Sequence, residues 1–315
     1  FAGTYFPKET RYRRIGMLDL LPQINSYWTT KQDSLITDAK NMTERLQSRH
    51  NSSRYKGSKL SSSALKNTYT RFVETFDSEH GGFGKSPKFP KPHDYLFLLK
   101  YSNRDEDSNA IHMATKSLKE MRMGGLYDQI GFGFHRYSTD SKWLVPHFEK
   151  MLYDQALLIH AYLEAFIHTQ DNFYKNVVEE IIEYVLRDMT SDLGGFYSAE
   201  DADSEGEEGV FYLWTVDEIK SILSREDSKF IIDILNFDKS GNWHDGKKNK
   251  TNIPHFNNNW EEISDKYKQN KIEIIKRYDR IRSKMFNIRE GRVHPQKDDK
   301  ILTDWNGLMI SALAK

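Results

Sequence analysis

The spacing of apolar residues predicts helices over most of the chain. Apolar positions recur at the three- and four-residue intervals of a helix face in ten segments, 16–28, 62–76, 93–101, 108–122, 146–168, 173–189, 216–223, 229–235, 272–285 and 306–315. Pro146 suits the first turn of its helix, where the missing N–H costs nothing. Strands are expected only at 1–7 and 209–215, and 241–270, rich in Asn and Lys, is expected to be an irregular insertion. The chain is therefore predicted to be mainly α.

A Gly-Gly-aromatic turn follows three of these helical segments, at Gly81–Phe83, Gly124–Tyr127 and Gly194–Tyr197. A paired glycine can end a helix in the left-handed conformation and let the chain turn sharply. Helix, glycine turn and next helix alternate in this way in stacked helical hairpins. The unequal spacing of the turns suits long hairpins whose loops gather at one end. We therefore expect an (α/α) toroid, with a generic helical bundle as the alternative.

Composition excludes several classes of function. Lys plus Arg and Asp plus Glu both number 46, so no net charge attracts a polyanion, and we expect no nucleic-acid partner. No apolar run approaches the ~18 residues of a membrane span, and no signal-peptide pattern opens the chain. The absence of cysteine excludes disulfides, thiolate metal sites and cysteine nucleophiles in this sequence. We expect a cytoplasmic globular protein without a membrane anchor, metal or cofactor.

Candidate chemistry gathers at 133–155, GFHRYSTDSKWLVPHFEKMLYDQ, between a glycine turn and a predicted long helix. Loops held by a rigid scaffold commonly carry function. The rings of Phe134, Tyr137 and Trp143 can stack on the apolar face of a sugar. Polar side chains that can bind hydroxyl groups or move protons stand among them: His135, Arg136, His147, Glu149 and Asp154.

Two interpretations of this segment remain open. His147 and Asp154 are seven residues apart and share a helix face if the helix begins near Pro146. Alternatively, His135 and His147 are structural histidines and Trp143 belongs to the core.

A second cluster holds six acids within nine residues, Glu200, Asp201, Asp203, Glu205, Glu207 and Glu208. It resembles the first half of a calcium-binding EF-hand loop, but Tyr212 occupies the twelfth position, where a bidentate Glu is required. The distal acids from Glu205 onward are expected to lie in a solvated loop. Glu200 and Asp201, which follow the aromatic turn at Tyr197, are the better candidates for a cavity.

A third cluster places Asp304, Trp305 and Asn306 just before the last predicted helix. Asp304 is a candidate catalytic residue or a helix N-cap, which contributes about 1 kcal/mol. The glycine-rich loop at 81–92 lacks the spacing of a phosphate-binding P-loop. The chain contains neither G-x-S-x-G nor H-E-x-x-H.

Long stretches of the chain resemble the YyaL and spermatogenesis-associated protein 20 family, among them GGFGKSPKFP, GGLYDQIGFGFHRYSTDSKWLVPHFEKMLYDQA, GGFYSAEDADSEGEEGVFYLWT and DDKILTDWNGLMI. The resemblance implies a thioredoxin-like domain joined to an (α/α)6 barrel similar to N-acylglucosamine 2-epimerases and six-hairpin glycosidases. Residues 1–30 would be the tail of the thioredoxin-like domain, 31–60 a linker or helix, and 61–315 the first part of an incomplete barrel. The missing redox domain and barrel half, or a second chain, would cover exposed apolar helix faces.

We expect a carbohydrate ligand, and three hypotheses follow, with epimerisation ranked ahead of hydrolysis. His135 and His147 could flank a sugar carbon and epimerise it, one removing a proton and the other returning it. Two carboxylates could instead cleave a glycosidic bond; the candidates are Asp128, Glu149, Asp154, Glu200, Asp201 and Asp304. The third hypothesis is a non-catalytic binding domain that serves the redox domain. The residues expected to bind the substrate are Tyr127, Asp128, Arg136, Tyr137, Trp143, Tyr197, Asp201, Trp305 and Asn306.

Overall fold

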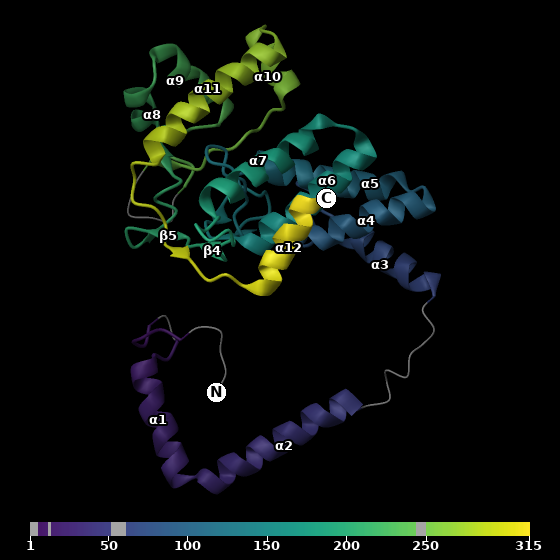
Figure 1. Ribbon diagram of the computed structural model, residues 1–315, viewed down its shortest axis with the longest axis vertical. Helices are drawn as coiled ribbons and strands as arrows, with labels where there is room; N and C mark the ends of the chain where they lie inside the picture. Colours follow the sequence, from purple (N-terminus) through teal and green to yellow (C-terminus); the bar gives the residue numbers. More distant parts are fainter. Residues whose placement is uncertain (1–5, 12–13, 52–60, 244–249) are drawn as a thin grey trace. The chain divides into compact units, whose positions relative to one another are not determined.

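The computed structural model describes residues 6–11, 14–51, 61–243 and 250–315, in two compact units, 1–62 and 63–315. The first unit contains α1 (Met17–Thr30) and α2 (Gln32–Asn51) (Figure 1). The Thr10 hydroxyl accepts a hydrogen bond from the Gly16 N–H and donates one to Asp19, so it fixes the start of α1. The helix expected at 16–28 is confirmed. Most of the strand expected at 1–7 lies outside the described residues, and its last two residues form no strand.

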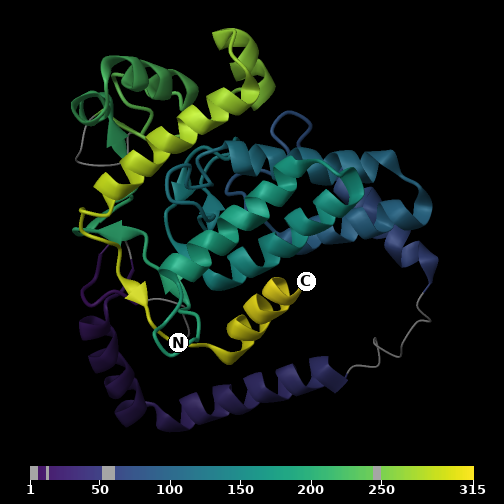
Figure 2. The same cartoon turned by 45° about the horizontal axis from the view of Figure 1, so that its top comes forward.

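Six helices of the second unit form two layers, and in chain order they alternate between these layers (Figure 2). One layer contains α4 (Pro92–Asp105), α6 (Leu152–Thr169) and α12 (Thr303–Ala314), and α6 packs against both of the others. The other layer contains α3 (Ser62–Thr75), α5 (Ser108–Met123) and α7 (Asn172–Asp188).

Side-chain contacts join the helices of the second layer to one another and to the first. Tyr69 of α3 stacks on Tyr101 of α4 at 4.6 Å and accepts a hydrogen bond from Asn109 of α5. Arg122 of α5 forms an ion pair with Glu180 of α7 at 3.0 Å. This alternation of paired helices is the arrangement of an (α/α)6 toroid, represented here in part. The predicted fold class is therefore confirmed.

The central helix α6 is buried on most of its surface because four helices, α4, α5, α7 and α12, pack against it. Its small residues Ala156, Ala161 and Ala165 are fully buried and permit close approach of the adjacent helices. Tyr162, also fully buried, donates its hydroxyl to the Leu118 carbonyl of α5 at 2.7 Å. Such a helix needs no wide polar face, which explains why its sequence is so apolar.

A helical insertion with its own hydrophobic core separates α7 from α12. It contains α8 (Val216–Ile222), α9 (Arg225–Ile234), α10 (Trp260–Tyr267) and α11 (Lys271–Arg289). The expectation of an irregular segment over 241–270 is wrong at its C-terminal part, where Asn259 begins α10 with a capping box. One face of α11 binds the 128–130 loop, because Tyr278, Arg282 and Arg289 bond to its backbone or to Asp128.

The connections between helices contain very short antiparallel strands. The pairs are β1 (Tyr137–Ser138) with β2 (Pro146–His147), β3 (Lys150–Met151) with β4 (Ala199–Glu200), and β4 with β9 (Lys297–Asp298). The others are β5 (Asp203–Ser204) with β6 (Glu207–Glu208), and β7 (Trp214–Thr215) with β8 (Thr251–Asn252).

Two predicted elements are corrected by this pairing. The helix expected from 146 begins only at Leu152, because β2 and β3 occupy 146–151, where Pro146 pairs with Ser138 and Lys150 with Glu200. His147 and Asp154 therefore do not share a helix face. The strand expected at 209–215 is reduced to β7, because Gly209 takes a positive φ of 77° and the next three residues form a turn.

The glycine turns differ in their physical role. At Gly194 the φ of 84° is the left-handed conformation expected of such a turn. At Gly124, which ends α5, the backbone is extended, so the expected left-handed cap is wrong. Here glycine is required by close approach, because a Cβ on Gly124 would lie 2.3 Å from the carbonyl oxygen of Trp143.

Candidate functional site

The candidate site lies where the short strands meet the N-terminal end of α6. We define the polar cluster as Arg136, His147, Glu149, Asp154 and Glu208. These side chains come from the β1–β2 hairpin and its flanks, from the first turn of α6 and from β6.

Ion pairs join four members of the polar cluster. Arg136 Nη1 donates to Glu149 Oε2 at 2.8 Å, and the Arg136 N–H donates to the Glu149 carbonyl at the same distance. His147 lies between two carboxylates, with Nδ1 2.7 Å from Glu208 Oε1 and Nε2 3.7 Å from Glu149 Oε2. All four side chains are partly exposed, so the charges are paired but accessible.

These contacts fix the protonation states. Hydrogen bonds to Glu149 and Glu208 raise the pKa of His147 to about 9, so the imidazole is charged at neutral pH. The hydrogen bond from His147, with the charge of Arg136, lowers the pKa of Glu149. Burial raises the pKa of Glu208, but the contact with His147 outweighs it and the pKa is lowered. The cluster thus contains an imidazolium and a guanidinium between two carboxylates.

The pKa of Asp154 is shifted in the direction opposite to those of Glu149 and Glu208. It lies in the first turn of α6 and is 7% exposed, and its Oδ2 has no hydrogen-bond partner among the described residues. Burial raises the pKa of Asp154 to about 8, with the charge of Glu149 adding to the effect and Arg136 opposing it. At neutral pH Asp154 is a neutral carboxylic acid beside the ionised Glu149. Two carboxyl groups whose pKa values are driven apart form an acid and base pair.

Aromatic rings lie beside this cluster. Tyr137 stacks on Phe89 at 4.7 Å and lies 5.0 Å from the His147 ring. On the α6 side, Tyr153 meets Trp305 of α12 edge to face at 4.8 Å. All four rings are partly or largely exposed, so a ligand can reach them. Tyr137 and Trp305 therefore remain plausible stacking residues.

His135 does not join the site. It is 1% exposed, its Nδ1 lies 2.9 Å from the Phe148 carbonyl, and its ring packs edge-on against Phe148 and Tyr212. Burial lowers the pKa of His135 to about 3. The expected pair of histidines facing each other across a sugar is therefore wrong, and His135 is structural.

Three further candidates belong to the core. Trp143 is fully buried and its indole N–H donates to the His80 carbonyl, so the expected contact with substrate is wrong. Tyr127, 1% exposed, donates its hydroxyl to Glu180 at 2.8 Å. Asp128 forms buried ion pairs with Lys150 at 2.9 Å and Arg289 at 2.8 Å. None of the three is placed to contact a ligand.

The candidates from the second cluster lie apart from these contacts. Glu200 is buried in β4 and accepts a hydrogen bond from the Tyr184 hydroxyl at 2.7 Å. Asp201 is exposed and accepts the Asp203 N–H, which shapes its own loop. Tyr197 is half-buried, and its N–H donates to the Met189 carbonyl.

The candidates from the third cluster flank α12. Asp304 is exposed in the first turn of that helix, whose N-cap is Leu302, so the N-cap alternative is wrong. Asn306 binds both the N–H and the carbonyl of Phe196 through its amide, at 2.8 and 2.9 Å. Asn306 thereby fixes the turn that follows α7. The binding roles of Tyr197 and Asp201 and the catalytic role of Asp304 stay predictions.

Sequence reasoning placed Glu208 in a solvated loop, yet it accepts hydrogen bonds from His147 and from the Phe148 N–H. The turn of its hairpin explains this. Glu205 and Gly206 both take positive φ, 56° and 78°, as the tight two-residue turn of a β-hairpin requires. The turn folds β6 back along β5, so that Glu208 pairs with Asp203 and reaches His147. The Glu-Gly pair is the sequence signal that could have revealed this hairpin.

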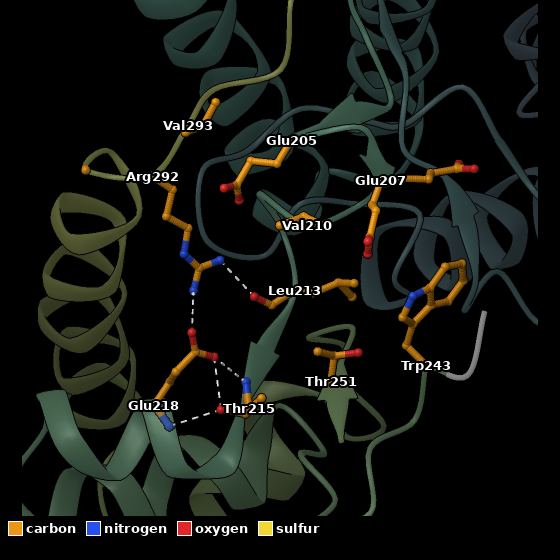
Figure 3. A pocket seen from close by; sticks show the side chains of 12 residues that line it. Glu205, Glu207, Val210, Leu213, Thr215, Glu218, Trp243, Thr251, Arg292 and Val293 are labelled. Atoms are coloured by element: carbon orange, nitrogen blue, oxygen red, sulfur yellow. Dashed lines mark hydrogen bonds and ion pairs between the residues drawn. The ribbon is translucent and has the colours of Figure 1, made fainter. Parts of the chain in front are cut away.

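A cavity of about 650 Å³ lies on the other side of Glu208 (Figure 3). The β5–β6 hairpin, the chain leading into α8, and the residues that follow α11 contribute its walls. Its lining residues include Glu205, Glu207, Glu208, Glu218, Trp243 and Arg292. Trp243 and Arg292 were not anticipated, since both lie far along the chain from the other candidates.

Neither a cluster of potential metal ligands nor a helix that could span a membrane occurs in the described part of the chain. No group of three or more His, Asp or Glu side chains within it is arranged to hold a metal ion. No helix within it is long and apolar enough to cross a membrane.

A family model matches the N-terminal part of the chain, and curated relatives match nearly all of it. The Thioredox_DsbH family model, described as a protein of unknown function, DUF255, matches residues 1–47. Human spermatogenesis-associated protein 20 is 36% identical over 99% of this chain and 43% of its own length. The uncharacterized protein B0495.5 of Caenorhabditis elegans is 34% identical over 100% of this chain and 46% of its own length.

Solved structures that match part of this chain include cellobiose 2-epimerase from Bacillus thermoamylovorans B4167. It covers 47% of this chain and 43% of its own, with 13% identity and a TM-score of 0.39. The chain spans less than half the length of the curated relatives named above. Along its own length, the resemblance of this chain to the spermatogenesis-associated protein 20 family is confirmed.

Proposed function

We propose that the polar cluster binds a carbohydrate and cleaves a glycosidic bond, with Asp154 as the general acid and Glu149 as the carboxylate base. One observation carries the proposal: Asp154 is a buried, protonated carboxyl with an unpartnered oxygen, and the charge of the ionised Glu149 acts on it. A neutral acid beside a carboxylate is the combination that glycoside hydrolysis uses.

The reaction balances with these two groups and one water molecule. Asp154 donates its proton to the glycosidic oxygen as the bond from that oxygen to the anomeric carbon breaks. Glu149 accepts a proton from the water molecule that attacks the anomeric carbon. Arg136 and His147 hold Glu149 ionised and oriented, so they are positioning residues. The products are two shorter sugars with one water added.

The carbohydrate class is supported by the surroundings of the cluster. Tyr137, which contacts His147, and Trp305, which contacts Tyr153, are partly exposed rings, and aromatic rings provide flat apolar faces in ligand sites. The Arg136 side chain is partly exposed. Hydroxyl groups can accept from such a donor and donate to the carboxylates.

Epimerisation by two histidines ranks below hydrolysis, which reverses the order expected from the sequence. That mechanism needs two imidazoles that can exchange protons with the substrate. Only His147 is accessible, because His135 is buried against Phe148.

The test is turnover by the full-length protein of 4-nitrophenyl glycosides and of neutral oligosaccharides, with NMR detection of any isomerised sugar. We expect hydrolysis, and we expect Asp154→Asn to lower kcat/KM roughly 10²- to 10⁴-fold. Asp192→Asn, an exposed acid outside the cluster, is the matched control and should leave activity unchanged. Sugar binding without turnover by the wild type, or full activity of Asp154→Asn, would show that the proposal is wrong.

A further inference from the structure

The cavity behind Glu208 shares a wall with the polar cluster. Glu208 lines the cavity, and its Oε1 accepts the hydrogen bonds of His147 and of the Phe148 N–H. Trp243, on another wall, packs edge-on against Phe148 at 5.6 Å. A molecule in the cavity would therefore be separated from Glu149 by the side chains of Glu208 and His147.

Some residues that line the cavity form hydrogen bonds and an ion pair within the protein. Arg292 donates to the carbonyl oxygens of Phe211 and Leu213, both at 2.8 Å, and pairs with Glu218 at 3.6 Å (Figure 3). Glu218 also closes the capping box of α8 with Thr215. These groups hold the shape of the cavity and have little bonding capacity left for a ligand.

Trp243 differs from Arg292 and Glu218, because its indole N–H forms no hydrogen bond with a described residue. The residue is 7% exposed, and its backbone N–H donates to the Thr251 carbonyl. Its indole nitrogen has no hydrogen-bond partner among the described residues and points into the cavity in Figure 3. The indole nitrogen can be reached from the cavity, so an acceptor on a bound molecule can take the place of water as its hydrogen-bond partner.

The charge of the lining limits the class of ligand. Glu205, Glu207 and Glu208 all come from the β5–β6 hairpin, and carboxylates repel anionic ligands such as phosphorylated sugars. Carboxylates and an indole N–H bind neutral hydroxyl groups well. The volume of about 650 Å³ falls within the range of sites for small organic molecules.

We propose that this cavity is a subsite for neutral sugar residues that extend from the reacting one, so that the substrate is an oligosaccharide or glycan chain. The inference rests on the proposed function, since it takes the polar cluster as the place of reaction. Trp243 and Glu205 are its binding residues. The subsite selects chain length and excludes charged sugars.

The experiment measures binding to the full-length protein carrying Asp154→Asn, so that turnover does not consume the probes. The probes are linear gluco- and manno-oligosaccharides of one to four units and mannose 6-phosphate, titrated by calorimetry. We expect affinity for one series to rise at least tenfold from one unit to three, and no binding of the phosphate. Adding Trp243→Phe should weaken trisaccharide binding about fivefold, the effect of one hydrogen bond, and leave the monosaccharide unchanged.

Trp260→Phe is the matched control, because Trp260 packs on Phe256 and Tyr278 in the insertion and does not line the cavity. It should change neither affinity. Glu205→Gln tests the cavity without altering a core ring and should also weaken the trisaccharide selectively.

Three results would overturn the subsite: equal affinity for all chain lengths, equal effects of Trp243→Phe and Trp260→Phe, or no binding of any neutral probe. Failure of the proposed function has a separate signature. It would appear as wild-type turnover by Asp154→Asn, whereas the subsite is judged from chain-length dependence of binding alone.

Discussion

Two buried aspartates, Asp128 and Asp154, differ in how many of their carboxyl oxygens are bonded within the protein. This difference distinguishes a structural carboxylate from the proposed catalytic acid. Asp128 binds both Lys150 and Arg289, and its Oδ1 also accepts the N–H groups of Ile130 and Gly131. Asp154 keeps an oxygen without a partner among the described residues. Both are about equally buried, so burial alone does not distinguish a core residue from a candidate for catalysis.

The pKa values diverge for the same reason. Burial raises the pKa of Asp128, but the charges of Arg289 and Lys150 outweigh it and hold the pKa well below its usual range. For Asp154 burial dominates, and the pKa rises to about 8. The bonding capacity that remains after folding, rather than residue type, indicates which group can exchange a proton with a ligand.

The largest effect on stability is expected at Asp128. Asp128→Ala leaves the ammonium of Lys150 and the guanidinium of Arg289 buried without their carboxylate, and breaking a buried ion pair costs roughly 3–5 kcal/mol. Urea unfolding of the full-length protein should therefore show a large loss of unfolding free energy. A loss below about 1 kcal/mol would mean that Asp128 and Asp154 do not differ as described.

Asp154→Asn should instead stabilise the protein, by an amount that grows with pH. The folded pKa of Asp154 is raised to about 8 from an ordinary value of 3.8, so the folded state binds more protons than the unfolded state between these values. Unfolding free energy of the wild type then falls as pH rises, by up to about 1.4 kcal/mol per pH unit from this group. The variant lacks this dependence, and parallel unfolding curves from pH 4 to 8 would contradict the account.

A smaller effect, on the pKa of His147, is expected from a substitution of Glu208, which is partly exposed. Glu208→Gln removes one of the two carboxylates that raise the pKa of His147 to about 9, so the pKa should move down toward 6.5. His147 stabilises the fold fully below its unfolded pKa of about 6.5, and this contribution is lost as pH rises through about 9. NMR titration of the imidazole in the full-length protein measures the shift, and Glu205→Gln, on the same hairpin, is the control.

The sequence was informative where local spacing decides the structure. The helices α5 and α7 agree with the predicted segments to within a few residues, because their apolar faces recur at helical intervals. The start of α6 could not be predicted, since β3 pairs with β4 about fifty positions along the chain. Tertiary pairing of this kind overrides local propensity.

The candidate site was predicted only in part, because contacts between distant parts of the chain also form it. The density of polar and aromatic residues at 133–155 pointed to the segment from which Arg136, Glu149 and Asp154 of the proposed site come. His135 and His147 could not be told apart from sequence, because one meets the Phe148 carbonyl and the other meets Glu208 across a hairpin. Asp128 likewise requires Arg289, which the insertion contributes.

The central claim is that Asp154 is a protonated acid at neutral pH while Asp128 is ionised. Selective ¹³C labelling of the aspartate carboxyls in the full-length protein, followed by NMR titration from pH 3 to 10, tests it directly. The account predicts that the Asp154 carboxyl titrates near pH 8 and that Asp128 remains ionised throughout. Titration of Asp154 near its ordinary value of 3.8 would contradict both its protonation and its role as the proton donor.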